Sequence, residues 1–355
     1  MTLPATMCGV QLTRHGGPEA LVWRDDLAVP EPGPQEALIE ISAGGVNNTD
    51  IATRLGWYAP DSKGAVEEGS SFAEGSWSGA MAFPRIQGAE FCGRIVALGS
   101  EAGDWSIGQR VICPTNMPEP TQAEPSAYRA LGSDLDGAFA QYCLVPVRHL
   151  HDVSASPLTD IEIAAMPCAY GTAANLLARA GVQAGDRVLV TGASGGVGLA
   201  AVQLAHLKGA DVTGQCGTEK AEFVRGAGAN AVIGRDEIPA ARSFHKVIDL
   251  VGGPHWSQRI AALRAGGHYA VAGAIAGPIV EADLRVFYLN DITLHGCTFQ
   301  PECVFAELVG LINTASIRPL VSACFPLEEI ATAQAEFLTK RHAGKIVLKM
   351  PEVTQ

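Results

Sequence analysis

The sequence lacks any cluster of positive charge and any long apolar run. It has 25 lysines and arginines against 37 acids, which gives a formal net charge of −12. This balance argues against nucleic acid or an anionic membrane as the main partner. The N-terminus has no basic stretch followed by an apolar one, and no segment approaches the roughly 18 to 20 apolar residues that would span a bilayer. These absences predict a cytoplasmic protein with neither nucleic-acid nor membrane partners.

The sequence also lacks paired cysteines. Nine cysteines are scattered along the chain, and no two of them are separated by only two residues. A disulfide framework and a zinc ribbon both need closely spaced cysteines, so neither is predicted. Reduced thiols in a reducing compartment fit this pattern.

What is present is enough apolar sequence for two domains. The chain has 355 residues, of which 47% are hydrophobic and 17% charged. Short alternating strands dominate the first part, as in Glu36–Ile41, whereas helices and strands alternate after about residue 154. Thr159 and Glu162 have the spacing of a capping box, which predicts that a helix begins there.

A glycine-rich turn lies in the second part of the chain. The aliphatic run Val188–Val190 precedes it, and an apolar helical pattern over 199–205 follows it. The first amides of a helix lack internal partners and the helix dipole favours negative charge there, so a pyrophosphate can bind at this turn. A side chain at Gly195 would keep the backbone from the phosphate, and one at Gly198 would keep the helix off the sheet. The predicted cofactor contacts here are Gly192, Ala193, Ser194, Gly195, Gly196, Val197 and Gly198.

The same turn also fits the loop of short-chain reductases. Those enzymes carry the loop near the start of the chain and are similar to one another in a later Tyr-x-x-x-Lys pair. Here the loop lies more than half-way along, and none of the six tyrosines has a lysine four residues on. The short-chain class is therefore excluded.

Five separated motifs occur in one order: 45–50, 84–99, 137–142, the glycine-rich turn and 344–348. Together they resemble the medium-chain dehydrogenase/reductase superfamily, which contains zinc alcohol dehydrogenases and quinone oxidoreductases. The resemblance implies an α/β protein with a doubly wound parallel-sheet (Rossmann) cofactor domain at 154–299. Residues 1–153 and 300–355 would form a β-rich, chaperonin-10 (GroES)-like catalytic domain, with the ligand in the cleft between the domains.

The zinc branch of that superfamily places a cysteine where this chain has Asn47 and a histidine where it has Ala89. Cys168 falls near the third ligand position. A catalytic zinc needs about three protein ligands, and neither a neutral amide nor an alanine is a plausible one. The sequence therefore predicts no metal and is more similar to the zinc-independent branch, while a zinc-type alcohol dehydrogenase with replaced ligands stays open as an alternative.

In the zinc-independent branch an Asn-x-x-Asp pattern precedes Gly-x-Tyr, and Asn47, Asp50, Gly56 and Tyr58 match it. A carbonyl that accepts hydride develops negative charge on its oxygen, so a hydroxyl or amide donor beside it lowers the barrier. Tyr58 and Asn47 are the predicted donors. Thr49 matches the proton-relay hydroxyl of zinc alcohol dehydrogenases and is an alternative donor, and Tyr58 could instead only pack against substrate. Asp50 is expected to hold the loop through backbone amides.

The end of the second strand of the cofactor domain decides the cofactor. NAD enzymes carry an acid there, but this chain reads Gln215-Cys216-Gly217-Thr218-Glu219-Lys220. Gly217, Thr218 and Lys220 resemble the NADPH-using quinone reductases, and Arg235 could supply a second charge for the 2′-phosphate, although Glu219 departs from a purely basic pocket. NADP(H) is therefore the predicted cofactor. By resemblance the remaining cofactor contacts are Val251, Ala272, Gly273 and Lys345.

The predicted reaction is hydride transfer from NADPH to a quinone, an enone or another small carbonyl substrate. Residues 60–83 form an irregular stretch directly after Tyr58, and we expect it to border the substrate pocket. The resemblance further implies a homo-oligomer. A different class stays open, namely an NADPH-binding protein without turnover that acts as a sensor or structural partner.

Overall fold

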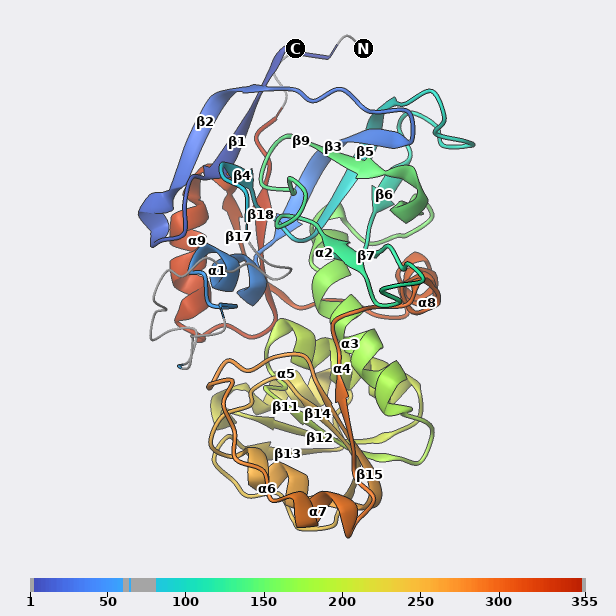
Figure 1. The fold of residues 1–355 in the computed structure, drawn as a ribbon, viewed down its shortest axis with the longest axis vertical. Helices are drawn as coiled ribbons and strands as arrows, with labels where there is room; N and C mark the ends of the chain where they lie inside the picture. The colour runs from blue at the N-terminus through green and yellow to red at the C-terminus, as the bar shows by residue number, and fades with distance from the viewer. Residues whose placement is uncertain (1–2, 60–63, 65–80, 353–355) are drawn as a thin grey trace. The chain divides into compact units, whose positions relative to one another are not determined.

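The computed structural model describes residues 3–59, 64 and 81–352, and these fall into two compact units. The terminal unit contains both ends of the chain, with residues up to 168 and from 305 onward. The central unit contains residues 169–304. Figure 1 shows the terminal unit in blue to green and in red, and the central unit in yellow-green to orange.

The terminal unit is built on two sheets (Figure 1). The smaller has the order β2-β1-β4, and the larger has the order β10-β6-β5-β3-β18-β17, with β9 also paired to β3. The C-terminal strand β18 runs antiparallel to β3, with Val347 opposite Gly45. The bounds are β1 Thr6–Leu12, β2 Leu21–Ala28, β3 Glu36–Gly45, β4 Arg85–Ile86, β5 Phe91–Leu98, β6 Arg110–Ile112, β9 Tyr142–Pro146, β10 His151–Asp152, β17 Val321–Pro326 and β18 Lys345–Lys349.

Side chains on one face of β3, two residues apart, contribute to the core of this unit. Ile39 and Ile41 pack with Phe91 and Ile95 of β5, all of them buried. A hairpin of β7 (Asn116–Pro118) and β8 (Tyr128–Ala130) lies beside this core. The helices are α1 Asn48–Arg54, α2 Asp160–Ala164, α8 Glu302–Asn313 and α9 Ile330–Leu338, with 3-10 turns at Pro18–Ala20, Val147–His149 and Leu327–Glu329. The predicted capping box at Thr159 and Glu162 is confirmed as the start of α2.

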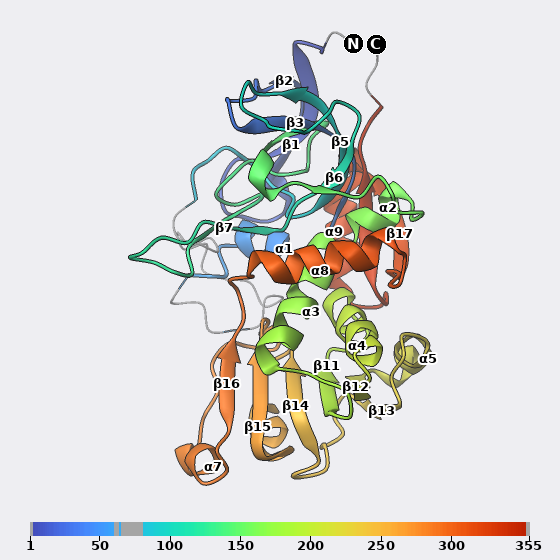
Figure 2. The same ribbon diagram turned by 90° about the vertical axis from the view of Figure 1, so that its right-hand side faces the viewer.

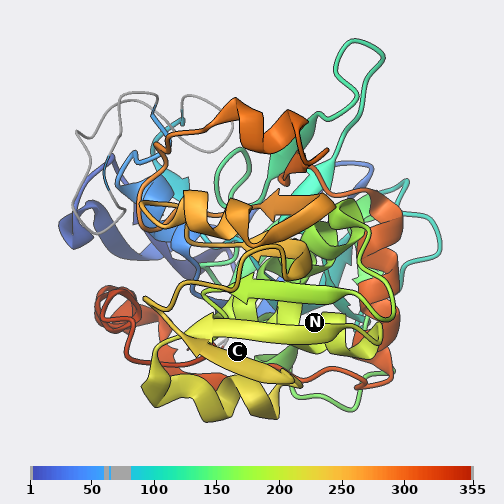
Figure 3. The same cartoon turned by 90° about the horizontal axis from the view of Figure 1, so that it is seen from below.

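The central unit is a six-stranded sheet in which every pair is parallel (Figures 2 and 3). Its order is β13-β12-β11-β14-β15-β16, so the chain starts in the middle, winds to one edge and returns to the other. The predicted doubly wound sheet is confirmed. The strands are β11 Arg187–Thr191, β12 Asp211–Cys216, β13 Ala231–Gly234, β14 Phe244–Asp249, β15 Leu263–Val271 and β16 Thr293–Gly296. The helices are α3 Pro167–Ala180, α4 Gly196–Leu207, α5 Ala221–Gly226, α6 Trp256–Ala261 and α7 Leu284–Tyr288, with a 3-10 turn at Thr218–Lys220.

The unit boundaries differ from those drawn on the sequence. The first lies between 168 and 169 rather than 153 and 154, because α2 packs against β3 and β5 of the terminal unit. The second lies between 304 and 305 rather than 299 and 300. Most of the 60–83 stretch, which we expect to border the substrate, lies outside the described residues. Within the described ranges no helix has the length and apolar character needed to cross a membrane.

Candidate active site

The glycine-rich turn connects β11 to α4 at the middle of the parallel sheet. Gly192 has a positive φ of 58°, a conformation that favours glycine, and Gly195 is the N-cap of α4. A Cβ at Gly198 would lie 2.6 Å from the Cα of Ala193, so the turn itself requires this glycine. The sequence had instead predicted that Gly198 allows the helix to pack against the sheet. A Cβ at Gly195 would meet only the Gly192 carbonyl at 3.5 Å. The backbone beside the N-terminus of α4 is thus open to a phosphate.

The structure brings Gly217 and Arg235 to the same edge of the sheet. Cys216 at the end of β12 is paired with Gly234 at the end of β13, and these two residues follow directly. The Gln215 side chain donates to the carbonyls of Arg235 and Glu237, at 3.2 and 2.8 Å, and so ties the two strand ends together.

The residues predicted to bind the 2′-phosphate are Gly217, Thr218, Lys220 and Arg235. Thr218 and Lys220 belong to the 3-10 turn that follows Gly217. Lys220 is buried, and its ammonium lies 3.9 Å from the carboxylate of Glu219. Arg235 is exposed. Two cations and one competing acid therefore surround the end of β12.

The residues predicted to line the nicotinamide lie at the ends of β14 and β15. Asp249 and Val271 are paired at those ends, and the Ala272 amide donates to the Asp249 carbonyl at 3.3 Å. A Cβ at Gly273 would lie 2.8 Å from the Leu250 carbonyl, so the two turns approach each other closely. Val251, Ala272 and Gly273 are therefore brought together at one edge of the sheet.

Asp249 joins this edge to the glycine-rich turn, and the sequence did not reveal its role. Its carboxylate is fully buried and accepts hydrogen bonds from the Thr191 hydroxyl at 2.5 Å and from the amides of Val251 and Gly252 at 3.0 and 3.2 Å. The Thr191 hydroxyl in turn accepts from the amide of Leu250 at 3.0 Å. One carboxylate thus holds both turns that are predicted to face the cofactor.

The charge of Asp249 is compensated inside the central unit. The Arg259 guanidinium lies 3.3 Å from the carboxylate and donates to the Gly252 carbonyl at 2.8 Å. The Tyr269 hydroxyl also donates to Asp249, and burial together with the neighbouring carboxylate raises the pKa of Tyr269. A sequence signal did exist, because an acid at the end of an apolar strand has to find a partner when it is buried.

In the terminal unit the structure brings two of the predicted donors together. Thr49 lies on α1, and the Tyr58 hydroxyl donates to the Thr49 hydroxyl at 3.3 Å. The ring of Trp57 packs edge-on against that of Tyr58, with centroids 5.4 Å apart. Desolvation of the half-buried Tyr58 raises its pKa to about 12. The tyrosine therefore stays protonated near neutral pH, as a proton donor must.

Asn47, the third predicted donor, is part of a buried network with Glu90 and Lys345. Its amide nitrogen donates to Glu90 Oε1 at 2.9 Å and to the Gly45 carbonyl at 3.3 Å, and its Oδ1 accepts from Lys345 at 2.5 Å. The Lys345 ammonium also contacts Glu90 Oε1 at 2.6 Å and the Val46 carbonyl at 3.1 Å. Lys345, predicted from the sequence to contact the cofactor, is only 3% exposed.

Asp50 lies beside this network and caps α1. Its carboxylate accepts the Asn47 amide at 2.8 Å and is also bonded to the amide of Ala89. The predicted loop-holding role of Asp50 fits these two contacts. Burial raises the pKa of Asp50 to about 7, with Glu90 adding to the rise and Lys345 opposing it.

The residues at the zinc-branch positions do not fit a catalytic zinc. Ala89 offers no side-chain ligand, and the amide oxygen of Asn47 is bonded to a cation, the Lys345 ammonium. Cys168 is the one residue at these three positions whose side chain is a zinc ligand type, and one ligand is too few for a catalytic zinc. Across the part of the chain that the structure describes, no three histidine, cysteine or acidic side chains form a cluster able to hold a metal.

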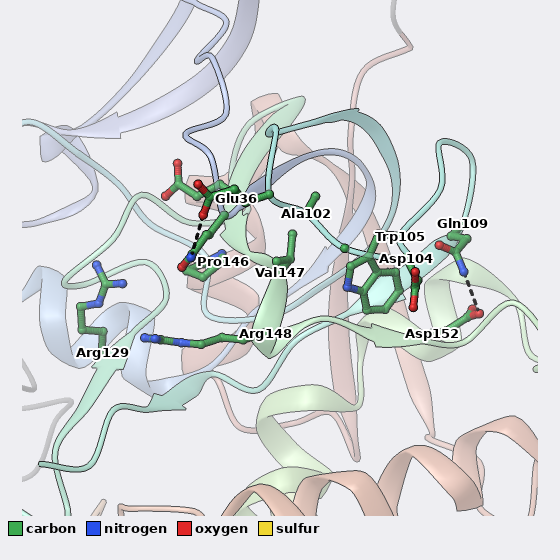
Figure 4. Close-up of a pocket in the computed structure, with 13 residues that line it drawn as sticks. Glu36, Ala102, Asp104, Trp105, Gln109, Arg129, Pro146, Val147, Arg148 and Asp152 are labelled. Atoms are coloured by element: carbon green, nitrogen blue, oxygen red, sulfur yellow. Dashed lines mark hydrogen bonds between the residues drawn. The ribbon is translucent and has the colours of Figure 1, made fainter.

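A cavity of about 740 Å³ lies elsewhere in the terminal unit (Figure 4). Trp105, Arg129 and Arg148 line it together with several acids, and none of the predicted site residues does. Both arginines are paired with Glu119, at 2.8 and 2.6 Å. The cavity is therefore separate from the candidate catalytic residues.

Two family models match the chain. The alcohol dehydrogenase GroES-like domain matches residues 33–155, and the zinc-binding dehydrogenase domain matches residues 196–314. Human quinone oxidoreductase is 27% identical over 96% of this chain and 97% of its own length. Acryloyl-coenzyme A reductase of Metallosphaera sedula is 29% identical over 90% of this chain and 93% of its own length. A crystal structure of a putative alcohol dehydrogenase from Sinorhizobium meliloti is 40% identical, covers 98% of both chains and has a TM-score of 0.89.

Proposed function

The chain belongs to the medium-chain dehydrogenase/reductase superfamily of oxidoreductases, and we propose that it is an NADP(H)-dependent reductase of quinones, enones or other carbonyl substrates that works without a catalytic zinc. The observation that carries this proposal is the pair of hydroxyls on Tyr58 and Thr49, 3.3 Å apart, beside a buried network whose cation is a lysine. A nicotinamide dinucleotide is the cofactor class of the family.

We assign to the terminal unit the stabilisation and protonation of the substrate oxygen. When bound, NADPH would supply a hydride, which is two electrons and one proton, to a carbon of the substrate. Negative charge then develops on the substrate oxygen, and a hydrogen bond from Tyr58 or Thr49 stabilises it. A proton from the same hydroxyl, replaced from solvent, then neutralises the oxygen and gives an alcohol or hydroquinone; with an enone it gives the enol, which tautomerises to the saturated ketone. Asn47 has its amide hydrogens bonded to Glu90 and Gly45, so we assign it to positioning.

The choice of NADPH over NADH rests on the end of β12. The run Gln215-Cys216-Gly217 at this strand end contains no acid that would bind the ribose hydroxyls and repel a phosphate, and the Gln215 side chain is bonded to the β13 loop. Lys220 and Arg235 would attract the 2′-phosphate, while Glu219 would weaken that attraction.

Homo-oligomerisation is part of the proposal and has a candidate surface in the central unit. Six large apolar side chains are exposed between 279 and 294, around α7 and the edge strand β16: Ile279, Val280, Leu284, Tyr288, Leu289 and Leu294. Surfaces of this kind are typical of contacts with another protein. A monomer mass in solution would refute this part.

The test of the function measures NADPH binding by fluorescence and its oxidation with a quinone, an enone, an enoyl thioester and an aldehyde, with NADH in parallel. We expect tighter NADPH binding and turnover with one acceptor class. About one zinc per chain in the active protein would instead indicate a zinc-type alcohol dehydrogenase. Binding without turnover across the whole panel would favour a sensor or structural role.

A further inference from the structure

We propose that the Lys345 ammonium is the fixed cation of the terminal unit's site, and that it positions the helix carrying Thr49 rather than contacting the cofactor. The expected effect on turnover rests on the proposed function. The contacts of the Lys345 ammonium are seen in the structure and do not depend on that function.

The ammonium is fully engaged by protein oxygens. Its three hydrogens meet three acceptors: the Val46 carbonyl, Asn47 Oδ1 and Glu90 Oε1, at 3.1, 2.5 and 2.6 Å. Lysine has three donors and no acceptor, so this set satisfies it completely. To reach a pyrophosphate, Lys345 would have to leave Glu90 as a buried and unpaired charge.

The contacts tie four separate segments to one point. Val46 and Asn47 stand between β3 and α1, Glu90 directly precedes β5, and Lys345 opens β18. The other oxygen of Glu90 accepts the Cys168 amide of α3 at 2.7 Å. The Glu90 carboxylate also lies so close to Gly45 that a Cβ there would be 2.8 Å from its Cδ. The four segments therefore pack around one ion pair.

The connection to catalysis runs through α1. Asn47 caps this helix, its backbone amide donates to Asp50, and Thr49 lies between them. Thr49 is the hydrogen-bond partner of Tyr58. In a zinc enzyme the metal both polarises the substrate oxygen and holds the surrounding segments. Here the ammonium supplies only the second part, because it is buried and its charge is neutralised by Glu90.

The experiment separates a positioning role from a cofactor contact. Lys345→Met, Glu90→Gln and the double variant are compared with Lys349→Met, which removes an exposed lysine from the same strand. At saturating NADPH we expect Lys345→Met to lower kcat by about tenfold or more while the Kd for NADPH changes by less than about threefold. The control should match the wild type.

Chemical rescue tests the need for the charge itself. In Lys345→Ala, ethylammonium or propylammonium should restore part of kcat without changing the Kd for NADPH, whereas tetramethylammonium, which has no N–H donor, should not. A tenfold weaker Kd for NADPH in Lys345→Met with kcat at saturation unchanged would overturn the proposal, and so would rescue by tetramethylammonium.

If no substrate of the panel supports turnover, the proposed function is refuted but the inference about Lys345 is not. Melting temperatures then test that inference. Removing one partner leaves an uncompensated buried charge, so each single variant should melt well below the wild type, and the double variant should recover part of the loss. The double variant also serves if a single variant does not fold. Additive losses in the double variant would overturn the ion pair as the anchor.

Discussion

In each unit a buried ion pair lies beside the predicted site, and the two pairs are built differently. Lys345 and Glu90 lie 255 residues apart in the chain and meet at 2.6 Å, whereas Asp249 and Arg259 are only 10 residues apart and meet at 3.3 Å. The first pair joins segments from both ends of the chain. The second joins the end of β14 to helix α6 within the central unit.

The cation of the central pair is an arginine and that of the terminal pair is a lysine, and the two contact different sets of oxygen atoms. Asp249 accepts from two hydroxyls and two backbone amides, and the planar Arg259 contacts both its carboxylate and the Gly252 carbonyl. Lys345 instead is a compact charge that faces three oxygens at once. The comparison therefore predicts that damage to the central pair weakens cofactor binding, whereas damage beside the terminal pair slows turnover.

The largest effect is expected from Asp249→Asn. The variant leaves Arg259 buried without a counter-charge, which should lower the free energy of unfolding by about 3 to 5 kcal/mol and weaken NADPH binding. Chemical denaturation and fluorescence titration measure the two quantities. Asp211→Asn, an exposed acid at the start of β12, is the control. Unchanged cofactor affinity in a folded Asp249→Asn would break the comparison.

Tyr58→Phe should affect turnover alone. Loss of the hydroxyl donor should lower kcat by about 10²-fold, which is about 2.7 kcal/mol of barrier, and leave the Kd for NADPH unchanged. Steady-state kinetics at saturating NADPH measures the first and fluorescence titration the second. Thr49→Val tests the alternative donor, and a larger loss there than in Tyr58→Phe would exchange the two roles.

Asp50 should make the stability of the protein depend on pH. Its pKa is about 7 in the folded protein and about 3.9 when unfolded, so the native state binds the proton more tightly. The stabilisation is complete below the unfolded pKa and is lost as pH rises through 7, by about 2 kcal/mol between pH 5 and pH 7. Denaturation of wild type and Asp50→Asn across this range measures it, and equal slopes would contradict the assignment.

Lys220→Ala should have the smallest effect and should act only on the cofactor. Loss of one cation at the end of β12 should weaken NADPH binding by about tenfold and leave NADH binding nearly unchanged. The ratio of the two dissociation constants is the measurement. A parallel loss for both cofactors would place Lys220 away from the 2′-phosphate.

The sequence was most informative where the contacts are local. The glycine-rich turn, the capping box at Thr159 and the parallel sheet all follow from patterns within a few residues or from strands and helices that alternate along the chain. The turn chemistry of Gly192 is also local, because its positive φ depends on the residue itself.

Tertiary structure alone decided the role of Lys345 and the place of the first unit boundary. Lys345 meets Asn47 across 298 residues, and no local pattern encodes which acid a distant lysine will find. The sequence could only assign Lys345 by resemblance, to the cofactor. Likewise, α2 reads as the first helix of a new domain, yet it belongs to the terminal unit because its apolar face is buried against β3 and β5. Local chemistry determines which elements form, whereas burial between distant segments determines which charges are paired.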